Sequence, residues 1–165
     1  MAISKVGLTT AVTGTLPAAN GGTGATSFSP GKVLQVVQST TTTTVTHSTT
    51  FADTGLSATI TPSSTSNKIL VLINQHCYAQ GAGGGSVKLF RDSTAIQTFS
   101  QNYAFYVDIS NANVRQYFSF NHLDTPSSTS ALTFKTQARG YASSTAFLTQ
   151  NDGFKSYITL MEVSA

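Results

Sequence analysis

The chain has 165 residues, of which only 9% are charged, whereas an ordinary soluble domain has about 25%. Its polar surface is expected to come from hydroxyl groups instead, because the sequence contains 27 threonines and 21 serines. The net charge of +3 does not indicate nucleic-acid binding, since the nine basic residues stand singly and form no run that follows a phosphate backbone. A single cysteine, Cys77, excludes an internal disulfide, so stability must come from packing or from association with other chains.

Residues 1–30 are expected to form an extended arm, and residues 31–165 a folded domain. After Leu8, the arm has only Leu16 and Phe28 as sizeable apolar side chains, which is too little to offset the entropy of ordering it alone. Its glycines do not match a nucleotide-binding loop, because Ser27 replaces the third glycine of G-x-G-x-x-G and the P-loop lysine is missing. We interpret them as a linker in which the backbone follows an unusual path. We expect neither a signal peptide nor a membrane-spanning segment.

From residue 32 onward the apolar residues recur with a period of two, which is typical of β-strands. No stretch has the i, i+3, i+4 spacing of a helix. The pattern therefore predicts an all-β fold, an antiparallel β-sandwich of jelly-roll type. Strands are expected at 32–38, 44–51, 55–62, 67–78, 103–110, 114–123, 131–138 and 155–163, with a hairpin at 86–99 that turns at 91–94 and with turns at 62–67, 80–86, 110–113, 124–130 and 150–153.

Three of these strands carry apolar side chains on both faces, although a sandwich strand needs only one apolar face. In 69–73, for example, Leu70 and Leu72 alternate with the other apolar residues. Another copy of the chain would cover the second face, so we expect a cyclic oligomer, a homotrimer. The alternative is that a curled sheet buries these strands within one monomer. The candidate interface residues are Leu70, Leu72, Tyr117, Ile158 and Leu160.

The side chains that could carry chemistry form no recognisable catalytic constellation. His47, His76 and His122 are widely separated, and His76 and Cys77, as strand neighbours, point to opposite faces. The six acidic residues stand singly, and no tryptophan is present to line a sugar cleft. We therefore expect no enzyme, no cofactor and no metal, with a metal on a three-fold axis as the alternative. The tyrosines and amides of residues 101–118 suit sugar binding, or else pack the sandwich or an oligomer seam.

The stretch 14–28, GTLPAANGGTGATSF, resembles the LP-x-A-N-G-G-T-G segment that recurs in tail-fibre and other appendage proteins of tailed bacteriophages. Residues 31–73 and 156–163 look like a β-sandwich domain of such phage proteins. The resemblance implies a homotrimeric virion protein that attaches through its arm and exposes the sandwich. The residues that carry the segment, and hence the expected docking or linker motif, are Leu16, Pro17, Ala19, Asn20, Gly21, Gly22, Thr23 and Gly24.

The sequence thus predicts a structural virion protein, a tail-fibre or appendage component of a tailed bacteriophage. Its expected partners are copies of itself, other virion proteins of the tail, baseplate or capsid, and a host-surface glycan, with no nucleic acid and no membrane insertion. Because the segment at residues 16–24 lies so near the start, a capsid decoration protein (cement or head fibre) is the alternative. A secreted carbohydrate-binding module is a third reading.

Overall fold

The computed structural model of the protein describes residues 31–99, 105–108, 111, 113–141 and 146–165. The chain divides into two units, Met1–Gly31 and Lys32–Ala165, and nearly all of the described residues belong to the second. The expected linker motif at residues 16–24 lies outside the described residues. The expected sugar-binding segment, residues 101–118, is described only in part.

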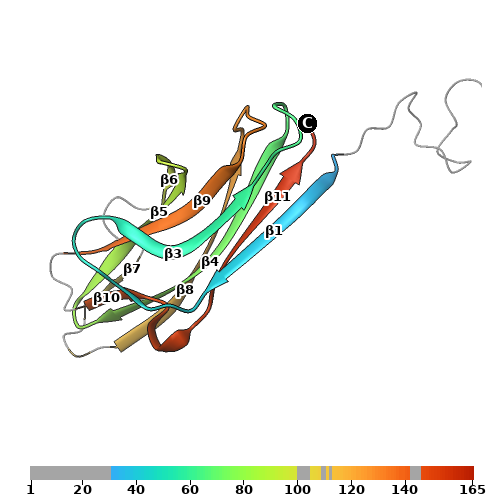
Figure 1. The fold of residues 1–165 in the computed structure, drawn as a ribbon. Helices are drawn as coiled ribbons and strands as arrows, with labels where there is room; N and C mark the ends of the chain where they lie inside the picture. The colour runs from blue at the N-terminus through green and yellow to red at the C-terminus, as the bar shows by residue number, and fades with distance from the viewer. Residues whose placement is uncertain (1–30, 100–104, 109–110, 112, 142–145) are drawn as a thin grey trace, which may run out of the picture. The chain divides into compact units, whose positions relative to one another are not determined.

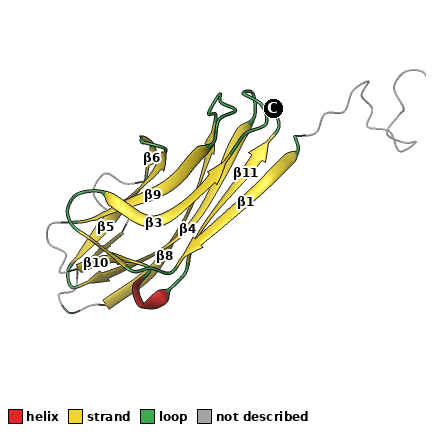
Figure 2. Cartoon of the chain, viewed as in Figure 1, coloured by secondary structure: helices red, strands yellow, loops and turns green. Residues whose placement is uncertain are grey.

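The described residues form eleven strands and one short 3-10 turn, η2 (Asn151–Gly153) (Figures 1 and 2). This confirms the all-β prediction. The strands are β1 (Val33–Thr41), β2 (Val45–His47), β3 (Ala52–Ile60), β4 (Lys68–Gln80), β5 (Gly83–Arg91), β6 (Thr94–Thr98), β7 (Phe105–Val107), β8 (Asn113–Asp124), β9 (Leu132–Gly140), β10 (Ala146–Thr149) and β11 (Ser156–Val163).

The strands build two antiparallel sheets that pack face to face, so the predicted sandwich is confirmed. Sheet A has the order β1-β11-β4-β10-β2, with β8 on the other side of β4. Sheet B has the order β3-β9-β5-β6, with β7 also beside β5. Successive pairs are nested along the chain: β1 pairs with β11, β3 with β9, β4 with β8 and β5 with β6. Such nesting is that of a long hairpin rolled up into two sheets, as in a jelly roll.

Strand β4 is the longest element of the sandwich. Its first half, from Lys68 to Asn74, pairs with β11, and its second half, from Cys77 to Gln80, pairs with β10. Along its other edge, β8 follows it from Ile69 to Gln80. The strand therefore runs through both ends of the interior.

Strict alternation fills one end of the interior with aliphatic side chains. On β3, Leu56, Ala58 and Ile60 are buried and their neighbours are exposed, as the sequence pattern predicts. They pack against the inward residues of β4 and β11 in a cluster that we call the aliphatic end. It consists of Leu56, Ala58, Ile60, Ile69, Val71, Ile73, Leu89, Leu132, Phe134, Ile158 and Leu160.

The other end of the interior, the Phe147 end, holds one large ring among small side chains. Its members are Cys77, Ala79, Val87, Ala138 and Phe147. A Cβ atom on Gly85 would lie 2.3 Å from Cζ of Phe147, so the ring occupies the space that side chains on β5 would need.

A buried polar layer separates the two ends. On β4, Gln75 lies between Ile73 of the aliphatic end and Cys77 of the Phe147 end. On β9, Thr136 lies in the same way between Phe134 and Ala138. The hydroxyl of Thr136 donates to Oε1 of Gln75 at 2.9 Å and lies 2.6 Å from the hydroxyl of Thr54 on β3. Nε2 of Gln75 donates to the hydroxyl of Ser156 on β11 at 3.0 Å. The layer thus joins both sheets by side-chain hydrogen bonds.

Several element boundaries differ from the sequence-based expectation. The glycine-rich segment 80–86 was expected to be a turn, but β5 begins at Gly83, because glycines there allow the close approach of Phe105 and Phe147. Strand β10 was not expected, and β2 covers only three residues of the expected strand 44–51. The hairpin between β5 and β6 turns at residues 92–93, with Asp92 at φ 54°, and confirms the prediction.

Candidate functional site

The solvent face of sheet A carries a row of apolar side chains. On β4, Ile69, Val71 and Ile73 point into the sandwich, so Leu70 and Leu72 point outward. The register places Leu70 beside Met161 of β11 on one side and Leu123 of β8 on the other. Met161 in turn pairs with Val36 of β1. Four apolar side chains from four neighbouring strands therefore line up across this face.

The two outer side chains of this row are exposed, and the two central ones, Leu70 and Met161, are partly buried. Val36 is 54% exposed and Leu123 is 52% exposed, while Leu72, in the next row, is 37% exposed. We call the set Val36, Leu70, Leu72, Leu123 and Met161 the sheet A patch. A contiguous apolar surface that stays open in one chain is typical of an interaction site.

Two of the five candidate interface residues belong to this patch, and a third lies elsewhere on the same face. Leu70 and Leu72 point outward as expected. Tyr117 of β8 is 41% exposed and pairs with His76, three register rows away from Leu70. Its hydroxyl donates to the carbonyl of Lys155 at 3.1 Å. Tyr117 is thus engaged with the turn that precedes β11.

The placement of Ile158 and Leu160 on an outer interface was wrong. Both are fully buried at the aliphatic end, where Ile158 pairs with Ile73 and Leu160 with Val71. Apolar residues stand on both faces of β11, so a period of two alone does not decide which face is inside. Pairing with β4 decides it and turns Met161 outward. The candidate residues did not include Val36, Met161 and Leu123. Each of them is an apolar residue at a strand position whose side chain points to the outer face.

Glu162 is a structural carboxylate. Nδ2 of Asn67 and Nε2 of Gln35 each donate to it at 2.6 Å, and the backbone N–H and hydroxyl of Ser63 donate at 2.7 and 2.8 Å. Burial raises the pKa of Glu162, but these hydrogen bonds outweigh it and lower the pKa to about 2. The carboxylate therefore stays charged and ties the loop between β3 and β4 to the end of β11.

The histidines and the cysteine stand apart from one another. The ring of His76 stacks on Phe154, with centroids 4.5 Å apart, and meets the edge of Tyr117, while burial lowers its pKa. Cys77 points the other way, into the core, as expected, and burial raises the pKa of its thiol, which makes it unreactive. Within the described ranges, no three histidine, cysteine or acidic side chains come together in a way that could hold a metal ion.

Among the residues that the structure describes, no helix has the length and apolar character needed to cross a membrane.

No family model matches the chain, and no curated protein matches it either. The chain is similar to proteins in three solved structures of infectious bursal disease virus. For the viral particle, the identity is 12% and the TM-score 0.45, over 98% of this chain and 39% of that one. For the structure of the Gx strain, the identity is 13% and the TM-score 0.39, and the match covers 98% of this chain and 44% of that one. For particles derived from a point mutant of the VP2 protein, they are 13% and 0.40, over 98% and 40%. This chain spans about two fifths of the length of these proteins, and with such TM-scores the similarities carry no conclusion about its role.

Proposed function

We propose that the chain is a non-enzymatic structural protein of a virion, and that it assembles with copies of itself through the sheet A patch. The observation that carries this proposal is the row of Val36, Met161, Leu70 and Leu123, which crosses four neighbouring strands on the solvent face of sheet A. Fully burying one Val or Leu side chain contributes about 1.5–3 kcal/mol, so a second copy placed on this row gains a substantial driving force.

A ring of three copies is the assembly we propose, because the resemblance of residues 14–28 to phage appendage proteins implies a homotrimer, and its closed symmetry covers the patch on every chain. The patch occupies only one face of the sandwich, so sheet B stays exposed in such a ring. The buried glutamate, the engaged histidine and the unreactive thiol support a structural rather than a catalytic role.

The assignment to a tailed bacteriophage rests on the resemblance of residues 14–28 to the segment of phage appendage proteins. In this reading the arm, residues 1–30, attaches the oligomer to the particle as a tail-fibre or appendage component. In the alternative, a capsid decoration protein, the same arm and sandwich attach to the capsid instead of the tail.

Native mass in solution tests the self-association. At micromolar concentration we expect the purified chain to have about three times the mass of one 17.3 kDa chain. Leu72→Lys places a charge on the patch and should reduce this mass to that of one chain. Thr59→Lys, which adds the same charge on the exposed face of sheet B, should leave it unchanged. A wild-type chain that is monomeric and soluble under these conditions would overturn the proposal.

Incorporation into particles tests the role of the arm. Deletion of residues 1–28 should leave the oligomers intact but absent from purified particles. Truncated oligomers that still join particles would show that the arm is not the anchor. The copy number of the full chain separates the two locations, since a decoration protein matches the abundance of the capsid protein and an appendage is far rarer.

A further inference from the structure

The connection between β10 and β11 covers one histidine on the outer face of sheet A. We call residues 151–155 the Phe154 turn. Both ends of this turn are fixed on the backbone of His76: the N–H of Gln150 donates to the His76 carbonyl at 3.4 Å, and the His76 N–H donates to the hydroxyl of Ser156 at 2.9 Å. Between these two anchors no residue belongs to a strand. The turn can therefore move without displacing β10 or β11.

Contacts with the sheet hold the Phe154 turn in its closed position. Phe154 stacks on the ring of His76, with centroids 4.5 Å apart and an interplanar angle of 6°. The hydroxyl of Tyr117 donates to the carbonyl of Lys155 at 3.1 Å. The backbone of Asp152 has φ 57°, a left-handed conformation that residues other than glycine rarely adopt. The closed position therefore depends on side-chain contacts, and His76 supplies one of them.

The closed turn encloses the ring of His76 and leaves it without a hydrogen bond. His76 is 1% exposed, and neither its Nδ1 nor its Nε2 has a hydrogen-bond partner. The rings that cover it, Phe154 and Tyr117, are themselves 42% and 41% exposed, so a single layer of side chains separates His76 from water. A neutral imidazole leaves one donor and one acceptor unsatisfied there, whereas an imidazolium leaves two donors and a charge. Because burying an uncompensated charge costs more than burying a polar group, the closed turn favours the neutral ring.

The charged groups around His76 do not compensate for a positive ring. Strand β8 contributes Arg115 and the Tyr117 hydroxyl, the turn contributes Asp152 and Lys155, and β10 contributes no charged or titratable side chain. Asp152 is already engaged in an ion pair with Arg115. Burial lowers the pKa of His76 most, Arg115 lowers it further, and Asp152 raises it. The residues that the structure does not describe contain no aspartate or glutamate, so they hold no carboxylate side chain that could pair with the ring.

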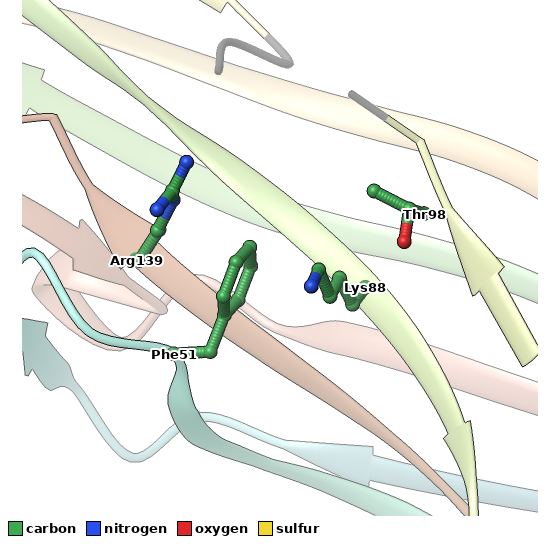
Figure 3. A pocket seen from close by; sticks show the side chains of 4 residues that line it. All are labelled: Phe51, Lys88, Thr98 and Arg139. Atoms are coloured by element: carbon green, nitrogen blue, oxygen red, sulfur yellow. The ribbon is translucent and has the colours of Figure 1, made fainter. Parts of the chain in front are cut away.

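The stacked ring of Phe154 does not remove the cost of a charge on His76. On sheet B, where cations also lie against a ring, the Lys88 ammonium and the Arg139 guanidinium carbon are 4.2 and 4.9 Å from the centroid of Phe51, around a cavity of about 160 Å³ (Figure 3). Both of these side chains are only partly buried, so water still solvates their charges. Phe154 instead helps to enclose His76, and its contact does not replace the hydrogen bonds that an imidazolium needs.

We propose that the Phe154 turn opens in mild acid: protonation of His76 releases Phe154 from the outer face of sheet A, while the strands stay folded. In the open form both ring N–H groups of His76 donate to water, which also solvates the new charge. Opening bares the rings of Phe154 and Tyr117 and adds a positive charge to the face that carries the sheet A patch. All of these groups belong to one chain, so the inference does not depend on the proposed self-association.

Proton linkage fixes the size of the expected effect. In the open form His76 takes up a proton near its ordinary pKa of 6.5, whereas in the closed form it does so only at lower pH. The ratio of open to closed molecules should therefore rise as the pH falls below 6.5, by up to about tenfold for each pH unit.

Amide hydrogen exchange of the full chain, followed by NMR from pH 7 to pH 5 and corrected for the intrinsic effect of pH, measures this ratio. The amides of Gly153 and Phe154 report on it, because in the closed turn they donate to the carbonyls of Gln150 and Asn151. Their protection should fall as the linkage requires, while the amides of β4 stay protected. The ring signals of His76 should titrate below pH 6.5, and titration at or above this pH would contradict the proposal.

Two substitutions of His76 remove the titrating ring. In His76→Gln and in His76→Phe the protection of the turn should no longer depend on pH, and His76→Phe, which keeps an aromatic partner for Phe154, should also keep the turn closed. His122→Gln is the matched control, because it removes a histidine from the other face of β8 and should leave the pH dependence unchanged. Constant protection of the wild-type turn, or a pH dependence that persists in both His76 variants, would overturn the proposal. An equal loss of protection in β4 and in the turn would also overturn it, because the whole sandwich would then be unfolding.

Discussion

The aliphatic end and the Phe147 end of the interior solve the same packing problem differently. At the aliphatic end, many branched side chains from both sheets interdigitate, and the sequence shows them by strict alternation. At the Phe147 end, the side chain of Phe147 takes the space left by two residues that lack side chains, Gly85 and Gly140. The comparison shows that glycines, which leave space for a neighbouring side chain, can specify a sandwich interior as well as large apolar side chains can.

The largest expected effect tests whether Gly85 and Phe147 form one unit. Gly85→Ala should lower the free energy of unfolding by about 3 kcal/mol, because its Cβ would collide with the ring at 2.3 Å. In a Phe147→Leu background, which removes the colliding Cζ and Cε atoms, the same substitution should cost about 1 kcal/mol or less. Denaturant unfolding of the four proteins gives this coupling. Equal costs in both backgrounds would show that the glycine serves another purpose.

Acid should lower the stability of the whole sandwich first through a histidine at the Phe147 end. Burial lowers the pKa of His47 to about 4, against a small opposing effect of a backbone hydrogen bond. The folded state therefore binds fewer protons than the unfolded state between pH 6.5 and 4, and stability falls as the pH decreases through this window. The full shift corresponds to about 3 kcal/mol. At the aliphatic end, the lowered pKa of Glu162 acts only below pH 4.5, since its stabilisation is lost as the pH falls from 4.5 towards 2.

Thermal unfolding followed from pH 7 to pH 4 measures this difference between the ends. His47→Gln should reduce the slope, and the remaining slope belongs partly to His76, whose pKa burial also lowers. A wild-type midpoint that stays constant down to pH 4.5 would contradict the assignment.

The smallest expected effect concerns the polar layer between the ends. Thr136→Val removes the hydroxyl that bridges Thr54 and Gln75 and leaves the buried Oε1 of Gln75 without its donor, at a cost of about 1–3 kcal/mol. Thr133→Val, on the same strand, breaks only a solvent-facing contact with Thr59 and should stay within about 0.5 kcal/mol. Chemical denaturation measures the free energy of unfolding of both variants. Similar losses of this free energy would mean that the buried hydrogen bonds stabilise the fold no more than the solvent-facing contact does.

Sequence reasoning succeeded where one physical effect dominates. On β3, alternation of apolar and polar residues correctly predicted that Leu56, Ala58 and Ile60 face the core. It failed at the Phe147 end, where Gly83–Gly85 have the composition of a turn. The close approach of the Phe105 backbone to Gly84 and of the Phe147 ring to Gly85 shows why the strand needs glycines there. Strand β10 escaped notice because its four residues show no clear alternation.

The candidate surface was anticipated only in part, for a related reason. The two apolar faces of β4 led to the prediction that Leu70 and Leu72 lie on an outer interface, and both point outward. On β11 the faces are nearly equal in apolar character, and pairing with β4, which no local pattern reveals, places Ile158 and Leu160 inside.

The length of β4 has a consequence for how the domain comes apart. Its thirteen residues form hydrogen-bonded ladders with partners at both ends of the interior and with β8 along nearly all of their length. Neither end of the interior can unfold alone, because its unfolding would break the hydrogen bonds of a strand that the other end shares. The sandwich should therefore unfold in a single cooperative transition, with amides at opposite ends of β4 exchanging with solvent at the same global rate.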